Sequence, residues 1–120
     1  MNKTDKKKFT SLCEKWGWEA TYDGEDNWTI RKFSPEGEDW TISLSGSTIS
    51  ELADDLNNYY ESLDPEEHAA EIYNAKHSGS EDARRFYADA PDSLRALLED
   101  AEDMQSEVHA LCEALYRACE

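Results

Sequence analysis

The first apolar residues of the chain are spaced by three or four positions: Phe9, Leu12, Cys13 and Trp16. This spacing predicts a helix over residues 5–16, with one apolar stripe and its Lys residues in water. Thr4 is placed to cap the helix, and Gly17 to end it.

Three short segments then alternate apolar and polar residues, which is the pattern of strands with one buried face. Their apolar positions are Trp18, Ala20 and Tyr22, then Trp28 and Ile30, then Trp40, Ile42 and Leu44. The turns at residues 23–27 and 34–40 contain Gly and several carboxylates. We expect a three-stranded antiparallel meander, whose acidic turns also discourage pairing with other chains.

Two helix starts follow the meander. Thr48 and Glu51 form a capping box, in which each side chain satisfies backbone N–H groups at a helix start, and the helix is expected to reach about Leu63. Asp64, followed by Pro and Glu, opens a second helix to about Lys76.

The remaining sequence predicts a short helix from Ser80 through Tyr87, ended by Pro91, and a long helix from Asp92 onwards. The apolar seam of the long helix steps by three and four through Leu94, Leu97, Ala101, Met104, Val108, Leu111, Leu115 and Ala118. Such a seam packs along the protein's own sheet and helices, or along a second copy in a homodimer through residues 94–118.

These elements predict a single α+β domain over residues 1–120. Residues 1–46 hold the N-terminal helix and the meander, and residues 47–120 hold helices. A chain of 120 residues buries enough surface for one core, and its four Trp, six Tyr and three Phe supply large buried area.

The net charge of the chain limits the class of molecule that it can bind. The chain has 28 acidic and 12 basic residues, a formal net charge of −16. Five Lys against two acidic residues give residues 1–18 a charge of +3, so the rest of the chain carries −19. This field repels nucleic acid and anionic membranes and favours a basic protein surface as partner.

The candidate partner-binding residues come from two acidic regions. Residues 51–75 hold eight acidic side chains and no Lys or Arg, and six of the eight are expected outside: Asp54, Asp55, Glu61, Glu66, Glu67 and Glu71. The last helix adds a second ridge off its apolar seam: Glu99, Asp100, Glu102 and Asp103. These carboxylates are either the solvated faces of a very soluble protein or a phosphate-like pattern that a basic groove recognises.

No catalytic motif, metal ligand set or cofactor-binding loop stands out. His109 and Cys112 share a helix face without a second ligand pair, and residues 23–27 lack the spacing of a calcium loop. We therefore expect no enzyme activity and no cofactor. The helix–meander–helix order is also that of a double-stranded RNA-binding domain, but the helix after the sheet has no basic residue.

The adjacent Tyr59 and Tyr60 cannot both face inward on one helix, so the outer one is either an interface anchor or an ordinary surface residue. No run of 18 apolar residues exists, residues 1–16 lack an apolar signal region, and the three Cys form no CxxC. A cytoplasmic protein with reduced thiols is expected.

Three segments carry a family resemblance: SPEGEDW followed by TISL, then LDPEEHAAEIYNA, then PDSLRALLEDAEDM. In this order they resemble a group of small acidic proteins of conjugative elements and prophages of gut Firmicutes. The likeness covers about residues 28–118 and implies a mobile-element setting. Inhibitors in that setting, anti-CRISPR proteins and anti-restriction DNA mimics, are similar to this chain in size and charge only, so they assign no site residues.

The function expected from the sequence is a non-catalytic inhibitor of a defence nuclease, of the Cas9 type or a restriction enzyme. It would bind the nucleic-acid groove of the nuclease through the acidic helices. The alternative is another acidic interaction protein, such as the immunity partner of a basic toxin or an assembly factor that dimerises through its last helix.

Overall fold

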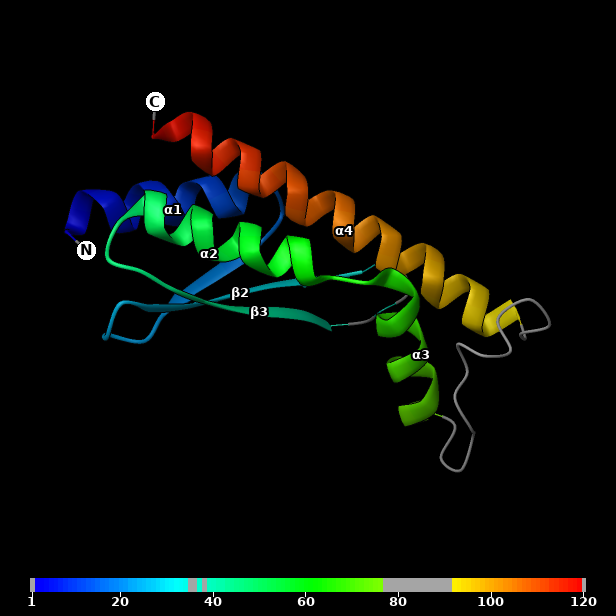
Figure 1. The fold of residues 1–120 in the computed structure, drawn as a ribbon. Helices are drawn as coiled ribbons and strands as arrows, with labels where there is room; N and C mark the ends of the chain where they lie inside the picture. Colours follow the sequence, from blue (N-terminus) through cyan, green and yellow to red (C-terminus); the bar gives the residue numbers. More distant parts are fainter. Residues whose placement is uncertain (1, 35–36, 38, 77–91, 120) are drawn as a thin grey trace.

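The computed structural model of the protein describes residues 2–34, 37, 39–76 and 92–119. Its elements are α1 (Lys3–Lys15), β1 (Glu19–Tyr22), β2 (Asn27–Phe33), β3 (Asp39–Ser45), α2 (Ile49–Ser62), α3 (Pro65–Lys76) and α4 (Asp92–Ala118). The α+β prediction of a helix, an antiparallel meander and a helical remainder is confirmed (Figure 1). The short helix expected from Ser80 to Tyr87 lies outside the described residues.

Helix α1 packs on the sheet through part of the predicted stripe, since Trp16, its last member, is the C-cap and is 36 % exposed. Phe9 and Cys13 are buried, and the Phe9 ring meets Trp28 edge to face, with ring centroids 4.7 Å apart. The N-cap is Asn2 instead of the expected Thr4, because the Asn2 side chain accepts the hydrogen bond from a first-turn backbone N–H. The helix therefore begins two residues earlier than predicted.

The three strands pair in sequence order, with Trp28 opposite Leu44 and Ile30 opposite Ile42. Strand residues alternate between a covered and an open face, so β3 has the burial pattern of a half-buried strand. The buried strand residues are Trp28, Ile30, Trp40, Ile42 and Leu44. Of the described helices, only α3 extends below the sheet in the view of Figure 1, where it turns down past one end.

Caps fix the starts of α2 and α3 where the sequence predicts them. Thr48 Oγ1 accepts from the backbone N–H of Glu51 at 3.1 Å. The Glu51 carboxylate accepts from the backbone and the hydroxyl of Ser47, both at 2.7 Å, one residue earlier than an ideal capping box. These bonds lower the pKa of Glu51. At α3, Asp64 accepts from the backbone of Glu66 at 3.0 Å.

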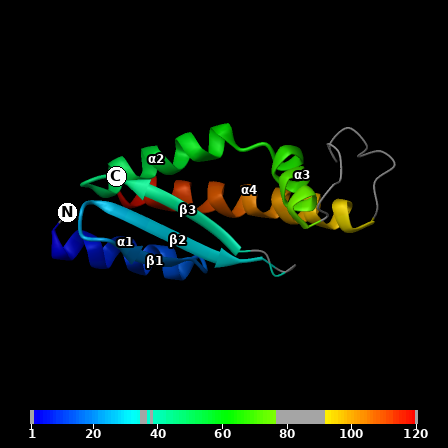
Figure 2. The same cartoon turned by 90° about the horizontal axis from the view of Figure 1, so that it is seen from below.

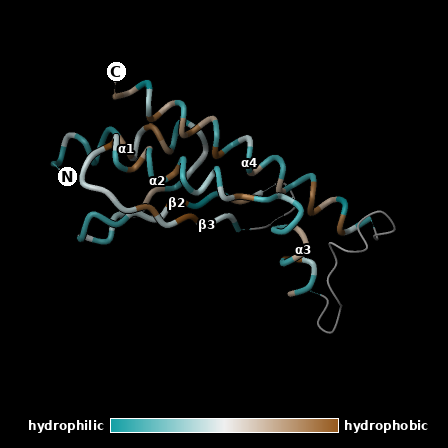
Figure 3. The backbone as a smooth tube through the Cα atoms, viewed as in Figure 1, coloured by the Kyte–Doolittle hydropathy of each residue, from teal (hydrophilic) through white to brown (hydrophobic). Residues whose placement is uncertain are grey.

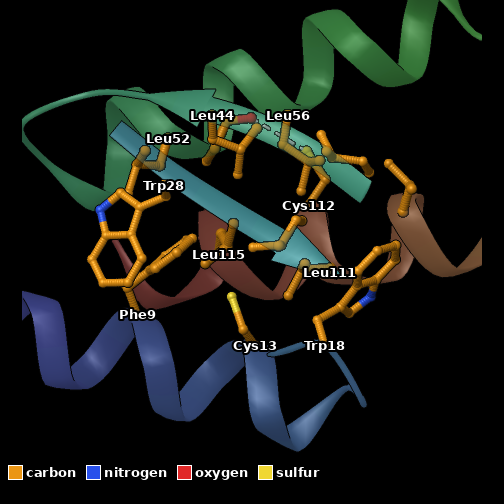
Figure 4. Packing of buried hydrophobic residues seen from close by; sticks show 14 of the residues in the cluster. Phe9, Cys13, Trp18, Trp28, Leu44, Leu52, Leu56, Leu111, Cys112 and Leu115 are labelled. Carbon is orange, nitrogen blue, oxygen red and sulfur yellow. Dashed lines mark hydrogen bonds between the residues drawn. The ribbon is translucent and has the colours of Figure 1, made fainter. Parts of the chain in front are cut away.

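One large core, the main core, lies between the sheet and the helices α1, α2 and α4. Figure 4 shows side chains of α1, such as Phe9 and Cys13, pointing toward Leu115 of α4 and Trp28 of β2. In Figure 3 hydrophobic positions recur along α4 between hydrophilic ones. The main core comprises Phe9, Cys13, Trp18, Trp28, Ile30, Trp40, Ile42, Leu44, Ile49, Leu52, Ala53, Leu56, Met104, Val108, Leu111, Cys112 and Leu115.

A smaller cluster, the second cluster, holds α3 against the first turns of α4. It comprises Ala69, Ala70, Leu94, Leu97 and Leu98, with Ile72 and Tyr73 packed at its side. Figure 2 shows α3 beyond the end of the sheet, so the second cluster lies away from the main core.

The seam of α4 is buried within this chain, as the first of the two sequence alternatives requires. Seam residues from Leu94 to Leu115 belong to α4's buried face, and Ala118 is partly exposed. A homodimer through residues 94–118 would have to open the fold to reach these side chains. In the described part of the chain, no helix is long and apolar enough to cross a membrane.

Candidate functional site

The three candidate carboxylates of α2 all accept hydrogen bonds from the chain itself. Asp54 accepts from the hydroxyl of Tyr116 at 2.7 Å. Asp55 is half-buried and accepts from the backbone N–H of Ser45 at 2.9 Å. Glu61 accepts from the side-chain amide of Asn57, one turn earlier in α2, at 3.2 Å. Asp55 therefore links α2 to β3. It does not belong to an exposed row of acidic side chains on α2.

The charges between α2 and α4 act on one another. The pKa of Tyr116 is raised to about 12, first by its hydrogen bond to Asp54, then by partial burial and by the negative charges of Asp54, a Cys112 thiolate and Glu61. The phenol therefore stays a donor up to strongly alkaline pH. Asp54 and Glu61 both contribute to a negative potential beside Tyr116, where α2 meets α4.

Helix α3 carries Glu66, Glu67 and Glu71, all exposed. Glu67 and Glu71 are one turn apart and so lie on one side of the helix. Both line a shallow pocket of about 230 Å³ at the elbow between α2 and α3. The complete lining is Tyr59, Ser62, Leu63, Asp64, Glu67, His68 and Glu71. The elbow therefore combines three carboxylates with the rings of Tyr59 and His68 in a concave surface.

Helix α4 exposes Glu99, Glu102 and Asp103, but the expectation for Asp100 is wrong. Asp100 is only 4 % exposed, and its Oδ1 has no hydrogen-bond partner among the described residues. The prediction assumed a narrow seam. Because α4 packs on α3, α2 and the sheet along its length, its buried face is wider than an a/d stripe and includes position 100.

Asp103 lies apart from the elbow. It lines a separate pocket of about 580 Å³ between α4 and the end of the β2–β3 hairpin. Its described neighbours there are Lys32, Phe33, Ser34, Trp40, Ser106 and Glu107. The ten sequence candidates thus do not form one surface: Glu67 and Glu71 meet at the elbow, while the α4 residues lie on another helix.

Several cations of the described part engage groups outside the candidate set. Lys32 pairs with Glu107 at 2.6 Å, and Arg31 pairs with Asp39 at 2.7 Å. Lys8 donates to the last turn of α4 at Ala118 O, where a cation complements the helix dipole. Part of the Lys-rich N-terminus therefore acts within the fold.

The side-chain carboxylates of five candidates have no hydrogen bond or ion pair within residues 2–34, 37, 39–76 and 92–119: Glu67, Glu71, Glu99, Glu102 and Asp103. Their helices are held by buried apolar residues, so the backbone positions that carry the charges are fixed, and the carboxylates are open to solvent. Such groups attract cations of a partner at long range and pair with them at contact.

Two aromatic features of the surface bear on the candidate residues. The sequence indicated the first, the pair Tyr59 and Tyr60, but sequence reasoning missed the second, Phe33. Tyr59 lines the elbow pocket, whereas Tyr60 stacks on His109 with ring centroids 5.0 Å apart. Phe33 is 62 % exposed and lies beneath the guanidinium of Arg31. Continuing the alternation of β2 by one step from Ile30 and Arg31 would have placed Phe33 on the open face.

The described residues hold no group of three or more His, Cys, Asp or Glu side chains placed for a metal ion. Cys112, considered above with His109, is buried and its thiol points to the carbonyl of Ala53 at 3.6 Å. Burial raises the pKa of Cys112, and it raises the pKa of Cys13 to about 12. Both thiols are therefore packing groups.

Comparison with known proteins adds no relative: no family model, no curated protein and no solved structure matches this chain. The geometry of the acidic helices is therefore the basis for the functional argument.

Proposed function

We propose that the protein is a non-catalytic inhibitor that binds a basic nucleic-acid groove of a defence nuclease through its acidic helices. The observation that carries the proposal is the set of five exposed carboxylates of α3 and α4 that have no partner in the described part of the chain. Solubility alone does not require that unpaired carboxylates gather on two packed helices. A partner rich in Arg and Lys, in contrast, binds more tightly with each carboxylate that it can pair.

The elbow supplies the most specific contact of this proposal. An Arg side chain that enters the pocket would meet Glu67 and Glu71 from α3 and the ring of Tyr59 from α2. Arg suits this lining because its planar guanidinium pairs with carboxylates and stacks on aromatic rings. Pockets of this kind are typical of interface hot spots.

The sequence resemblance to proteins of mobile elements favours a host defence nuclease among basic partners, of the Cas9 type or a restriction enzyme. Asp55 and Asp100 are left out of the proposed surface, because one binds β3 and the other is buried. Asp54, Glu61 and Glu66 contribute to the field around it.

The test is a pull-down from a host lysate with the wild-type protein and with a Glu67→Lys/Glu71→Lys variant. We expect the wild type to recover a nuclease, to release it when duplex DNA or guide RNA is added, and to inhibit its cleavage. The variant should lose most of this binding, because it places two cations in the contact.

A matched control is Glu14→Lys/Glu25→Lys, which makes the same change of net charge at exposed positions of α1 and the β1–β2 turn. This control should bind nearly as the wild type does, since its substitutions lie outside the proposed contact. Recovery of metabolic enzymes alone, or a bound nuclease that DNA does not displace, contradicts the proposal. Recovery of a basic toxin instead would favour the immunity-partner alternative.

A further inference from the structure

Strand β3 lies at an edge of the sheet. The order β1-β2-β3 leaves one side of β3 without a neighbouring strand, and β3 has seven residues (Figure 2). The other edge strand, β1, is only four residues long and packs against α1. An edge strand presents unpaired backbone groups to which another chain can bind.

The register of the β2–β3 pair identifies which groups of β3 point outward. Gly46 N donates to Asp26 O at 2.9 Å, and the β2–β3 register extended by one residue sets these two opposite each other. In an antiparallel ladder, hydrogen-bonded pairs alternate with non-bonded pairs. Trp40, Ile42 and Leu44 therefore bond to β2, and the odd-numbered residues direct their N–H and C=O groups to the open edge.

Asp55 provides an independent check of this assignment. Its carboxylate accepts from the backbone N–H of Ser45, which by the alternation points away from β2. Asp55 thus blocks the last outward donor of β3. Asp39, at the start of the strand, and Thr41 and Ser43, in its middle, remain as outward donors, and all three residues are exposed. From Asp39 to Ser45 the strand contains neither Pro nor Lys, two residue types that commonly protect an edge.

The charges around the free edge of β3 decide which kind of partner segment can bind there. Asp39 and Asp55 stand at the two ends of the edge, and Glu51 lies at the start of the adjacent helix α2. Arg31, which lies opposite Thr41 in the register, is paired with Asp39. A second copy of this chain would bring a net charge of −16 toward another −16. An extended segment with Lys or Arg at alternate positions meets the acidic flanks favourably.

We propose that the free edge of β3 binds an extended basic segment of a partner protein as a fourth strand, through the backbone of Thr41 and Ser43. In such β-augmentation the backbone hydrogen bonds supply affinity and the flanking carboxylates select basic side chains. The inference stands apart from the nuclease assignment, because any basic partner with an extended segment fits it and its test uses no nuclease.

The test uses the full chain and a blocked synthetic heptapeptide of alternating lysine and valine. We expect amide hydrogen exchange at Thr41 and Ser43 to slow at least about tenfold when the peptide saturates the protein. The same peptide with alternate backbone nitrogens methylated keeps its charge and loses its donors. It should bind about tenfold more weakly, since each hydrogen bond contributes about 1 kcal/mol.

Two variants sharpen the result on the protein side. Ser43→Pro removes an outward donor without removing a bond to β2 and should weaken the lysine–valine peptide about tenfold. Ala20→Pro makes the same change at an outward N–H of β1 and should leave binding unchanged. Circular dichroism verifies that both variants fold, and the methylated peptide tests the inference on unaltered protein.

Three results would overturn the inference. The methylated peptide could bind as tightly as the parent, which would mean that charge alone attracts it. Protection could be absent from Thr41 and Ser43 and appear on another element. The protein could form a concentration-dependent dimer that Ser43→Pro abolishes, which would assign the edge to a second copy.

Discussion

The main core and the second cluster hold the two ends of this molecule in different ways. The main core joins seventeen buried residues from the sheet, α1, α2 and α4, four of them aromatic. Among the described residues, the second cluster joins five, of which two are alanines. Three buried polar atoms without a hydrogen-bond partner in the described part lie on α3 and α4 near the second cluster: His68 Nε2, Asn74 Oδ1 and Asp100 Oδ1.

The main core also has three such atoms, the indole Nε1 of Trp18, Trp28 and Trp40, but more than three times as many apolar residues surround them. An unpaired buried polar atom costs about 1 to 3 kcal/mol of folding free energy. Three such atoms therefore remove a larger share of the stabilisation of the second cluster than of the main core. The difference teaches that the end with the acidic elbow is the less stable end. Binding surfaces are commonly drawn from such regions.

The largest expected effect comes from truncating one leucine in each region. Leu111→Ala, in the main core, should lower the free energy of unfolding by about 4 kcal/mol, because the site is fully buried and tightly surrounded. Leu97→Ala, in the second cluster, should cost about 2 kcal/mol, since its site can relax. Urea unfolding followed by tryptophan fluorescence measures both, and equal losses would contradict the comparison.

Loss of the N-cap of α2, a helix of the main core, should have a smaller effect on stability. Thr48→Ala removes the acceptor for the backbone N–H of Glu51 and should cost about 1 kcal/mol of global stability. Thr48→Ser keeps the hydroxyl and is the control, with stability near that of the wild type. A Thr48→Ala protein as stable as Thr48→Ser would show that the cap contributes nothing.

The bond between Tyr116 and Asp54 has a distinctive pH dependence. The folded-state pKa of Tyr116 is raised to about 12, above the ordinary value of about 10. The folded state therefore holds the proton more tightly, and the associated stability is complete below about pH 10 and lost as pH rises toward 12. Tyr116→Phe should cost about 0.5 kcal/mol at neutral pH, because the pair is partly exposed.

Alkaline unfolding curves of the wild type and Tyr116→Phe should converge as pH approaches 12. A constant difference across this range would mean that Asp54 does not hold the phenol. Absorbance titration of the phenol provides a second reading, in which Tyr116→Phe removes the group that titrates last.

The smallest effect concerns Glu51, whose pKa is lowered by hydrogen bonds from Ser47. The stability from this group is present above the ordinary Glu pKa of about 4.3 and is lost as pH falls through the lowered value. Glu51→Gln should flatten the acid limb of the stability curve by a measurable but small amount. An unchanged acid limb in thermal melts between about pH 2 and 5 would refute this role.

Local patterns were sufficient to predict the elements of the fold. The alternation of Trp40, Ile42 and Leu44 and the cap at Thr48 depend on near neighbours in sequence, and the structure confirms both. The N-cap of α1 was misplaced because Asn2 and Thr4 can both accept the same type of bond. Sequence offers no signal that separates two such neighbours.

The candidate site was predicted less completely, because partners distant in sequence decide it. Asp55 pairs with a strand ten residues earlier, and Tyr116 reaches Asp54 from 62 residues away. Asp100 is buried because several elements pack around one helix, which a single-helix pattern does not show. The acidic character of α3 follows from composition, whereas the pocket at its elbow depends on how α2 meets α3.

The central claim is that fixed carboxylates of the elbow are recognised by a basic partner. The most direct measurement is the affinity of the partner recovered in the pull-down, from about 0.1 to 0.5 M salt, for the wild type and two charge-neutralised variants. Glu67→Gln/Glu71→Gln should weaken binding at low salt about fivefold and reduce its salt dependence, whereas Glu14→Gln/Glu25→Gln should do neither. Equal effects of both variants, or an affinity that salt does not change, would contradict the claim.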